Sequence, residues 1–401
     1  MTAEDNRVEL RRVLAEQFPA SNHQLAPVET LGVRWRPASR RMRSTCCSTE
    51  EPMAKLVLTP DLLHSPTRLA TRMIARSRLL AVLEEAAHLE VGAAGSGAHR
   101  AAADSGEAEQ VKAVHDFRVA LRRLRSWLRA YRPFLDDTVT RRTERRLGRL
   151  SQLAGEVRDL QVEDAALRAI GSNPRASGGG GARWLADHLR IGVPRARRNL
   201  IAALAGQLPG AAATLSRQLQ RYVIAVDLDA MDDQDDTMAA TTASLMQRHA
   251  DALQGKLREW RRHPNSTAAA HATRIAAKRL RYLLEAFGES SRLAATAARH
   301  LGNLQDALGR AHDAQVVVTS LAEATAGAGK SLPPRRTVAA LRRTLRAQTR
   351  SALQEAHRKA GPRGLGMALT ATTRLQQRLR HDHRAPRDGV TLGAPTRGTG
   401  G

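Results

Sequence analysis

The sequence predicts an all-α protein in which two pseudo-symmetric helical-bundle halves surround a basic central cavity. Three observations lead to this class. Apolar residues recur at helical spacing from about Thr67 onward, with no convincing alternating strand pattern. A basic helical motif occurs twice, far apart in the chain. The 401 residues carry a formal net charge of +25, so the fold is expected to present a large cationic surface.

The repeated motif has the pattern His-x2-Arg-x3-(Arg/Lys)-Arg-x-Arg. One copy occupies residues 115–125 and the other 271–281. A second shared segment follows each copy, at 147–162 and 301–316, with glycines and an (Arg/His)-Asp pair in matching places. A repeat of this length indicates two similar half-structures rather than a solenoid.

The spacing of the motif places its basic residues beside the core of each half. A helix turns by about 100° per residue, so the basic residues of the first copy fall within about 80° of the circumference. They are His115, Arg118, Arg122, Arg125 and Arg129. The neighbouring side is apolar and is expected to be buried: Phe117, Leu121, Leu124 and Leu128. The second copy repeats this phase with His271, Arg274, Lys278 and Arg281, and with Leu280 and Leu284 on the core side.

Twelve helices are expected, about six in each half. Those of the first half are 67–91, 111–132, 139–154, 159–170, 182–206 and 211–225. Those of the second half are 238–262, 267–287, 292–308, 313–326, 335–359 and 365–381. Glycine or proline separates most of them, including Gly155, Pro209-Gly210 and Gly309.

The composition of the remaining segments divides the chain further. Residues 1–59 are predicted to be a largely disordered N-terminal extension, and 384–401 a disordered tail rich in Gly, Pro, Thr and Arg. Between them lies the helical domain, 60–383. An acidic linker, 227–237, separates its first half (60–226) from its second half (238–383).

The charge and the choice of basic residue favour a polyanionic partner. Only six of the 64 Lys and Arg residues are lysines, and arginine can bind two phosphate oxygens at once. Codon bias explains part of that ratio, but not the placement of the motif. Aromatic residues make up only 3% of the chain, which disfavours stacking on the bases of a single-stranded nucleic acid.

Other features indicate a reduced, cytoplasmic protein that does not enter membranes. Cys46 and Cys47 are adjacent, which is a poor geometry for a disulfide, and they lack zinc-ligand spacing. The first residues are polar and acidic, unlike a signal peptide, and no apolar run has membrane-spanning length.

The two basic motifs, each followed by a Gly-x2-(Arg/His)-Asp segment, resemble the CHAD family, the conserved histidine α-helical domain. The resemblance covers about residues 60–383. It implies two bundle-like halves with basic helices around a cavity or groove, binding of inorganic polyphosphate, and association with polyphosphate granules in some members. Many relatives also carry a triphosphate-hydrolysing CYTH domain, but its Glu-x-Glu-x-Lys signature is absent from residues 1–60.

The resemblance assigns polyphosphate binding to the basic positions of both copies. In the first they are His115, Arg118, Arg122, Arg123, Arg125, Arg145 and Arg158. In the second they are His271, Arg274, Lys278, Arg279, Arg281 and Arg299. His312 replaces the arginine that Arg158 supplies, so a weaker contact is expected there. Asp159 and Asp313 are expected to cap the next helix or to brace a nearby arginine.

The hypothesis is therefore a non-enzymatic polyphosphate-binding protein without a cofactor. A nucleic-acid or nucleoid-binding protein, favoured by bulk charge, and an accessory module of a phosphohydrolase are the alternatives. The histidines could instead bind a transition metal, with His115 and His271 meeting near His312, although nearby arginines would repel a cation. The segment 324–331 loosely matches a P-loop, but a helix precedes it and Pro333-Pro334 follows it, unlike a working P-loop.

Overall fold

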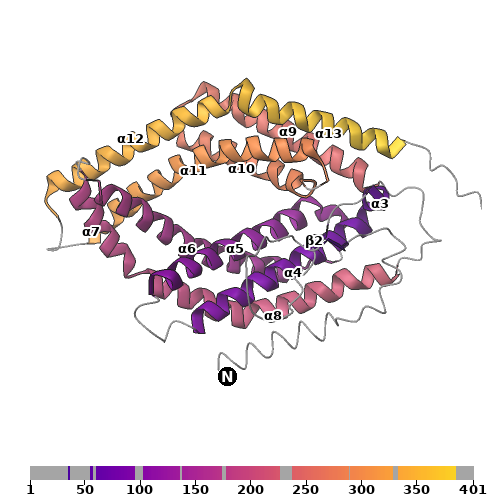
Figure 1. Ribbon diagram of the computed structural model, residues 1–401, viewed down its shortest axis with the longest axis horizontal. Helices are drawn as coiled ribbons and strands as arrows, with labels where there is room; N and C mark the ends of the chain where they lie inside the picture. The colour runs from indigo at the N-terminus through magenta and orange to yellow at the C-terminus, as the bar shows by residue number, and fades with distance from the viewer. Residues whose placement is uncertain are drawn as a thin grey trace, which may run out of the picture.

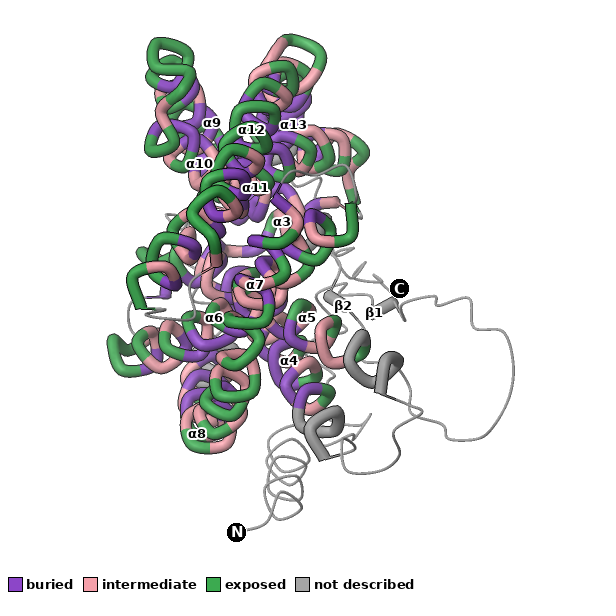
Figure 2. Tube along the Cα trace, turned by 90° about the vertical axis from the view of Figure 1, so that its left-hand side faces the viewer, coloured by how far each residue is buried: buried purple, intermediate pink, exposed green. Residues whose placement is uncertain are grey.

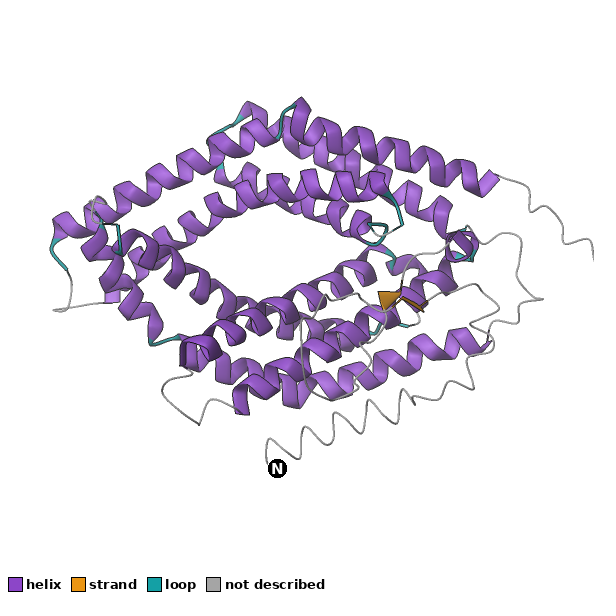
Figure 3. Ribbon diagram, in the orientation of Figure 1, coloured by secondary structure: helices purple, strands orange, loops and turns teal. Residues whose placement is uncertain are grey.

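Helices make up almost all of the structure, a computed structural model (Figure 3). The structure describes residues 35–36, 55–56, 60–94, 103–135, 138–173, 178–225, 237–288, 290–327 and 333–384. The all-α prediction is confirmed, apart from one antiparallel pair of two-residue strands, β1 (Trp35–Arg36) and β2 (Lys55–Leu56). Nearly all of the N-terminal extension, the acidic linker and the C-terminal tail lies outside the described residues, so the proposed domain limits stay predictions.

Most of the helices are long, and they follow one another in two sets along the chain. The first set comprises α3 (Pro60–His64), α4 (Thr67–Ala94), α5 (Ala103–Ala130), a 3₁₀ turn (Arg132–Phe134), α6 (Arg141–Gly171), α7 (Gly179–Arg190) and α8 (Val193–Ala225). The second comprises α9 (Met238–Arg262), α10 (Thr267–Glu285), α11 (Arg292–Gly327), α12 (Arg335–Lys359), the π-helical turn η6 (Pro362–Gly366) and α13 (Met367–Arg384). The motif copies lie on α5 and α10.

Two groups of four helices form the body of the molecule. Helices α4, α5, α6 and α8 pack around one another, and so do α9, α10, α11 and α13. The groups meet where α5 contacts α10 and where α6 contacts α11, and α7 contacts α12 at one end. Between these junctions the ribbons of α5 and α6 diverge from those of α10 and α11 (Figure 1). The pseudo-symmetric relation of the two groups stays a prediction.

Burial follows the expected sides of the two motif helices. Phe117, Leu121 and Leu124 of α5, and Leu280 and Leu284 of α10, are fully buried. The main hydrophobic core runs through both groups of helices, with the exposed residues on their outer surfaces (Figure 2). A separate, smaller core joins the ends of α6 and α11 to α7 and α12. Apolar burial therefore fixes the orientation of each motif helix and leaves its basic side uncovered.

Two aromatic residues after the first motif connect α5 to its neighbours. The indole N–H of Trp127 donates a 3.0 Å hydrogen bond to the carbonyl of Thr71 in α4. The hydroxyl of Tyr131 lies 2.7 Å from that of Thr242 in α9, and both aromatic rings are buried. Because α9 belongs to the second group, Tyr131 links the two groups through a buried hydrogen bond.

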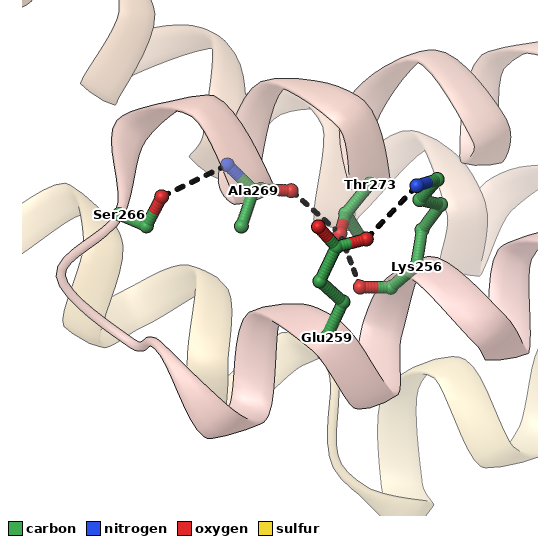
Figure 4. A network of polar contacts seen from close by, with 5 residues as sticks. All are labelled: Lys256, Glu259, Ser266, Ala269 and Thr273. Atoms are coloured by element: carbon green, nitrogen blue, oxygen red, sulfur yellow. Dashed lines mark hydrogen bonds and ion pairs between the residues drawn. The ribbon is translucent and has the colours of Figure 1, made fainter.

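Helix α10 is anchored at its start by side chains that satisfy free backbone groups (Figure 4). Ser266 is the N-cap, and its hydroxyl accepts a 3.2 Å hydrogen bond from the backbone N–H of Ala269. The hydroxyl of Thr273 is 3.2 Å from the carbonyl of Lys256 in α9 and 2.9 Å from that of Ala269. These contacts fix the position of α10 along the axis of α9. They therefore also fix the positions of the basic residues that follow in α10.

The predicted helix breaks at Gly155 and Gly309 are wrong. Helices α6 and α11 continue through both glycines. A glycine inside a helix costs only about 1 kcal/mol relative to alanine. Buried Ala154 and Val157 beside Gly155, and Leu308 and Ala311 beside Gly309, keep packing against the core across each position. Tertiary packing therefore outweighs the local preference.

Two further boundaries differ from the prediction. Helix α8 passes through Pro209, where a break was expected. A proline in a helix interior costs about 3 kcal/mol, but Leu204 and Leu208 before it and Leu215 after it are buried. The helix expected over 182–206 is instead divided into α7 and α8 at Gly192. The chain turns there so that α7 can pack against α6 and α12.

Candidate anion-binding site

The basic sides of α5 and α10 line one pocket together with α6. This pocket, called the basic pocket below, has a volume of about 470 Å³. Its lining consists of Arg118, Arg122, Arg125, Ser126 and Arg129 of α5, Ser151, Gln152, Gly155, Glu156 and Asp159 of α6, and Ile275, Lys278, Arg279 and Tyr282 of α10. Six of these residues are basic, and they come from both motif helices, which confirms the prediction that the two motifs face a shared space.

The cations of the two helices meet around Tyr282. The guanidinium carbon of Arg122 lies 5.3 Å from the centroid of this ring, that of Arg281 lies 5.5 Å from it, and Nζ of Lys278 lies 5.9 Å from it. An aromatic face attracts cations at these distances. Sequence reasoning missed Tyr282, because the matching position in the first motif is Ser126 and the repeat comparison gave it no weight.

Burial and mutual repulsion shape the electrostatics of the basic pocket. Burial lowers the pKa of Arg122 most, and the positive charges of Arg118 and Arg281 lower it further. Burial likewise lowers the pKa of Lys278 to about 7, with smaller effects from Arg122, Arg274, Arg118 and Arg281. An anion in the pocket would offset this repulsion, because opposite charge favours the protonated forms.

The two motif histidines have different neighbours. His271 lies beside His312, with 5.3 Å between the ring centroids. His115 instead lies near Arg158, whose charge, after burial, lowers the pKa of the histidine. Burial, followed by Arg274 and His271, also lowers the pKa of His312. The structure thus places each motif histidine near the first residue of its own (Arg/His)-Asp pair.

The expected helix-capping role of Asp159 and Asp313 is wrong, and the alternative bracing role is supported. Both carboxylates lie inside continuous helices, where no N-cap position exists. Oδ1 of Asp159 lies 3.9 Å from a guanidinium nitrogen of Arg118. The positive charge of Arg274 opposes the rise in the pKa of Asp313 that burial causes. Each aspartate therefore acts on the motif arginine that follows the histidine by three positions.

Among the remaining members of the predicted site, Arg123 connects the two motif helices, whereas Arg281 pairs within α10. Nε of Arg123 lies 3.3 Å from Oε2 of Glu285 in α10, and Nε of Arg281 lies 2.9 Å from Oε1 of the same carboxylate. Arg279, the counterpart of Arg123, lines the basic pocket. The carboxylate of Glu285 thus neutralises part of the charge on one side of the α5–α10 junction.

Arg145 and Arg299 lie farther along α6 and α11 and are exposed. Helical spacing places Arg145 on the same side of α6 as Gln152, Glu156 and Asp159, which line the basic pocket. Its counterpart Arg299 has the matching position on α11. Arg145 therefore extends the basic surface of α6 beyond the pocket lining, whereas α11, which carries Arg299, contributes no residue to that lining.

Two glycines leave space for motif arginines. A Cβ atom built on Gly148 would lie 3.6 Å from a guanidinium nitrogen of Arg125. A Cβ on Gly302 would lie 3.5 Å from one of Arg281. Both pairs occupy matching places in the two copies. Gly148 and Gly302 therefore allow arginine side chains to approach α6 and α11 closely, and neither glycine ends a helix.

The described residues offer no set of ligands for a metal ion. Within the part of the chain that the structure describes, no group of three or more His, Cys, Asp or Glu residues could hold a metal ion.

Among the described helices, none is long and apolar enough to cross a membrane.

The family model of the CHAD domain matches residues 93–322, which span most of α5 to α11 and include both basic motifs. The chain belongs to the CHAD family. The match covers more than half of the 401 residues. It includes the basic pocket and both (Arg/His)-Asp pairs.

Solved structures show the same fold at low sequence identity. The CHAD domain from the plant Ricinus communis matches with a TM-score of 0.56 and 21% identity, over 75% of this chain and 94% of that one. PptA from Streptomyces chartreusis matches with a TM-score of 0.50 and 17% identity, over 74% of this chain and 99% of that one. No curated protein matches the chain. At these identities the likeness concerns the CHAD fold alone.

Proposed function

We propose that this CHAD protein binds inorganic polyphosphate in the basic pocket and does not alter it chemically. The observation that supports the proposal is the convergence of Arg118 and Arg122 from α5 with Lys278 from α10 on one space. Polyphosphate is a flexible chain with a negative charge on every unit. It can place successive phosphates against guanidinium groups that each offer two parallel donors.

The shape of the basic pocket favours a thin chain over a nucleic acid. A protein that reads duplex DNA inserts a helix or strand into a groove, so its contacting residues must protrude. Here the arginines line a recess between three helices. Binding of single-stranded nucleic acid uses exposed aromatic rings for base stacking, whereas Tyr282 is only 4% exposed. Nucleic acid remains the second candidate because of the net charge of +25.

The chemistry of the pocket lining supports the proposal of binding without catalysis. Its hydroxyl groups are those of Ser126, Ser151 and Tyr282. A serine nucleophile needs a hydrogen-bonded base, and among the described residues neither serine has one. The remaining groups supply mainly positive charge, which suits retention of a polyanion.

Competition between polyphosphate and duplex DNA at fixed salt tests this proposal. Long-chain polyphosphate should displace a fluorescent DNA duplex at a far lower phosphate concentration than unlabelled duplex does. Affinity for polyphosphate should also fall steeply with added salt, because binding releases counterions. Displacement by the two polyanions at equal phosphate concentration would favour the nucleic-acid alternative, and a failure of polyphosphate to bind would exclude the proposed function.

We further propose a cytoplasmic protein that associates with polyphosphate granules. Association would follow from multivalent contact of the basic pocket and the extended basic surface with polymer at the granule boundary. A fluorescent fusion should coincide with granules in cells that accumulate polyphosphate. It should become diffuse when Arg118 and Arg122 are changed to glutamine. Granule association that persists in this variant would show that another surface is responsible.

A further inference from the structure

A second pocket adjoins the basic pocket at the junction of α5, α9 and α10. It has a volume of about 410 Å³ and is called the side pocket below. Its lining comprises Ser126, Trp127, Arg129, Ala130, Pro133, Leu245, Arg248, His249, Arg279, Tyr282 and Leu283. Ser126, Arg129, Arg279 and Tyr282 belong to the lining of both pockets. The side pocket therefore adjoins the basic pocket along a shared wall that contains two arginines.

The side pocket combines a cationic rim with an apolar floor. Arg129, Arg248 and Arg279 supply the rim, and none of them takes part in an ion pair among the described residues. The lining contains no carboxylate. Burial, followed by the charges of Arg279 and Arg248, lowers the pKa of His249. The three arginines are exposed, and an anion near them would offset their mutual repulsion.

The repeat reveals what is missing from this junction. On one side of the α5–α10 contact, Arg123 of α5 pairs with Glu285 of α10, and Arg78 of α4 donates a 2.9 Å hydrogen bond to the carbonyl of Arg123. On the other side, Arg279 is the counterpart of Arg123. The counterpart of Glu285 is Arg129.

The two sides thus differ by one exchange of charge. Where the first side has a carboxylate that the protein itself supplies, the second has an arginine, and Arg248 of α9 lines the same pocket. Arg129, Arg248 and Arg279 therefore surround a position that an external anion can occupy, as the carboxylate of Glu285 does at its own junction.

We propose that Arg129, Arg248 and Arg279 bind phosphates of the same polyphosphate chain that occupies the basic pocket, so that the chain leaves this pocket toward α9. This inference rests on the proposed function and adds a direction to it. On the opposite side, Glu285 repels the polymer. The buried side chains of Trp127, Leu245 and Leu283 limit water beneath the bound phosphates, which strengthens their attraction to the rim.

The variant that tests this path is Arg248→Gln. Arg248 lines the side pocket and not the basic pocket. The matched control is Arg258→Gln, which removes the same charge from an exposed position of the same helix. Arg248→Gln should weaken binding of long-chain polyphosphate by about tenfold, equivalent to ~1.4 kcal/mol. Binding of tripolyphosphate, which fits within the basic pocket, should change little, and Arg258→Gln should affect neither ligand.

NMR of His249 supplies a readout that does not depend on affinity. Long-chain polyphosphate should raise the pKa of His249 in the wild-type protein, because an anion at the rim offsets the charges of Arg248, Arg279 and Arg129. Arg129→Glu should abolish this ligand effect, since it places a carboxylate at the junction as Glu285 does on the other side. An unchanged His249 titration in wild type at saturating polyphosphate would overturn the proposal.

Other outcomes separate this inference from the proposed function. If wild type fails to bind polyphosphate, both are wrong. If wild type binds and Arg122→Gln weakens binding, but Arg248→Gln behaves like Arg258→Gln, the basic pocket holds the polymer and the side pocket does not. A pKa change of His249 with ADP but none with polyphosphate would assign the side pocket to a phosphorylated small molecule and would also overturn the proposed path.

Discussion

Arg123 and Glu285 form an ion pair across the α5–α10 junction, with 3.3 Å between Nε and Oε2. The same carboxylate lies 2.9 Å from Nε of Arg281. Glu285 is thus shared by one arginine from each motif. It holds both guanidinium groups in place and removes part of their charge from the surface that faces the ligand.

Glu285→Gln should therefore increase polyphosphate affinity and slightly reduce stability. The substitution keeps the shape of the side chain and frees the charge of Arg123 and Arg281 for phosphate. Because Arg123 is half exposed, the ion pair contributes only about 0.2–1 kcal/mol. Calorimetric titration and thermal denaturation measure the two effects. Glu259→Gln, at an exposed pair with Lys256 on α9, is the control and should not alter affinity. Weaker binding by Glu285→Gln would show that its positioning of the arginines outweighs its charge.

The geometry of arginine should matter beyond its charge. The triple substitution of Arg118, Arg122 and Arg125 by lysine preserves the net charge but removes paired donors. Hydrogen bonds to charged groups contribute about 1.5–3 kcal/mol each, so polyphosphate should bind at least about tenfold more weakly. The same substitutions at the exposed α12 residues Arg343, Arg346 and Arg350 form the control. Equal affinity of both triple variants would indicate that the ligand senses bulk charge alone.

Much of the site could be predicted from sequence because the motif is both periodic and repeated. Helical phase places Phe117 and Leu121 in the core, and this fixes the direction in which Arg118 and Arg122 point. The match between the copies then predicts that their basic sides face a common space. The first relation depends on local geometry, which spacing determines, and the second depends on the similarity of the two copies.

The features that sequence reasoning missed depend on long-range packing. Glycine predicts helix ends at Gly155 and Gly309, but packing of their buried neighbours keeps α6 and α11 helical through both positions. Tyr282 and Glu285 gain their roles only because α10 lies against α5. The two copies differ at these positions, with Ser126 matching Tyr282 and Arg129 matching Glu285. The effect of these differences can be inferred only when it is known which helices are in contact.

The space beside Gly302 should be required for binding. Gly302→Leu would push the side chain into the guanidinium of Arg281, which already lies 3.5 Å from the position of a Cβ. Displacing Arg281 removes its hydrogen bonds to a phosphate of the ligand, so polyphosphate affinity should fall about tenfold. Gly206→Leu on α8, where a Cβ would meet nothing within 4 Å, should leave binding unchanged. Both variants replace a helical glycine by a good helix former, so stability measurements control for propensity.

His115 should report ligand occupancy through its protonation. Burial and the charges of Arg158, Arg122 and Arg118 lower its pKa in the free protein. Polyphosphate near these arginines should raise the pKa, because it reverses the sign of the local field. An NMR titration with and without ligand measures the change, with His64 on α3 as an internal reference. The same titration curve for His115 in both states would place the ligand elsewhere.

Lys278 should make polyphosphate binding depend on pH near neutrality. Burial and the charges of Arg122, Arg274, Arg118 and Arg281 hold its pKa at about 7, far below the ordinary value for lysine. A lysine with a lowered pKa is neutral above that value and charged below it. The basic pocket therefore gains a positive charge as the pH falls from about 8 to about 6. Bound polyphosphate favours the charged form, so binding should also take up a proton.

The expected result is an affinity that rises about tenfold, or ~1.4 kcal/mol, over this interval in wild type. Lys278→Arg keeps the position charged throughout and restores the residue that the first motif has at Arg122. Its affinity should be high at both ends of the interval, and any remaining pH dependence should come from His115 and His312. Calorimetry in buffers of different ionisation enthalpy counts the protons taken up. If Lys278→Arg keeps the full pH dependence of wild type, the titrating group is a histidine, and Lys278 is already charged in the free protein.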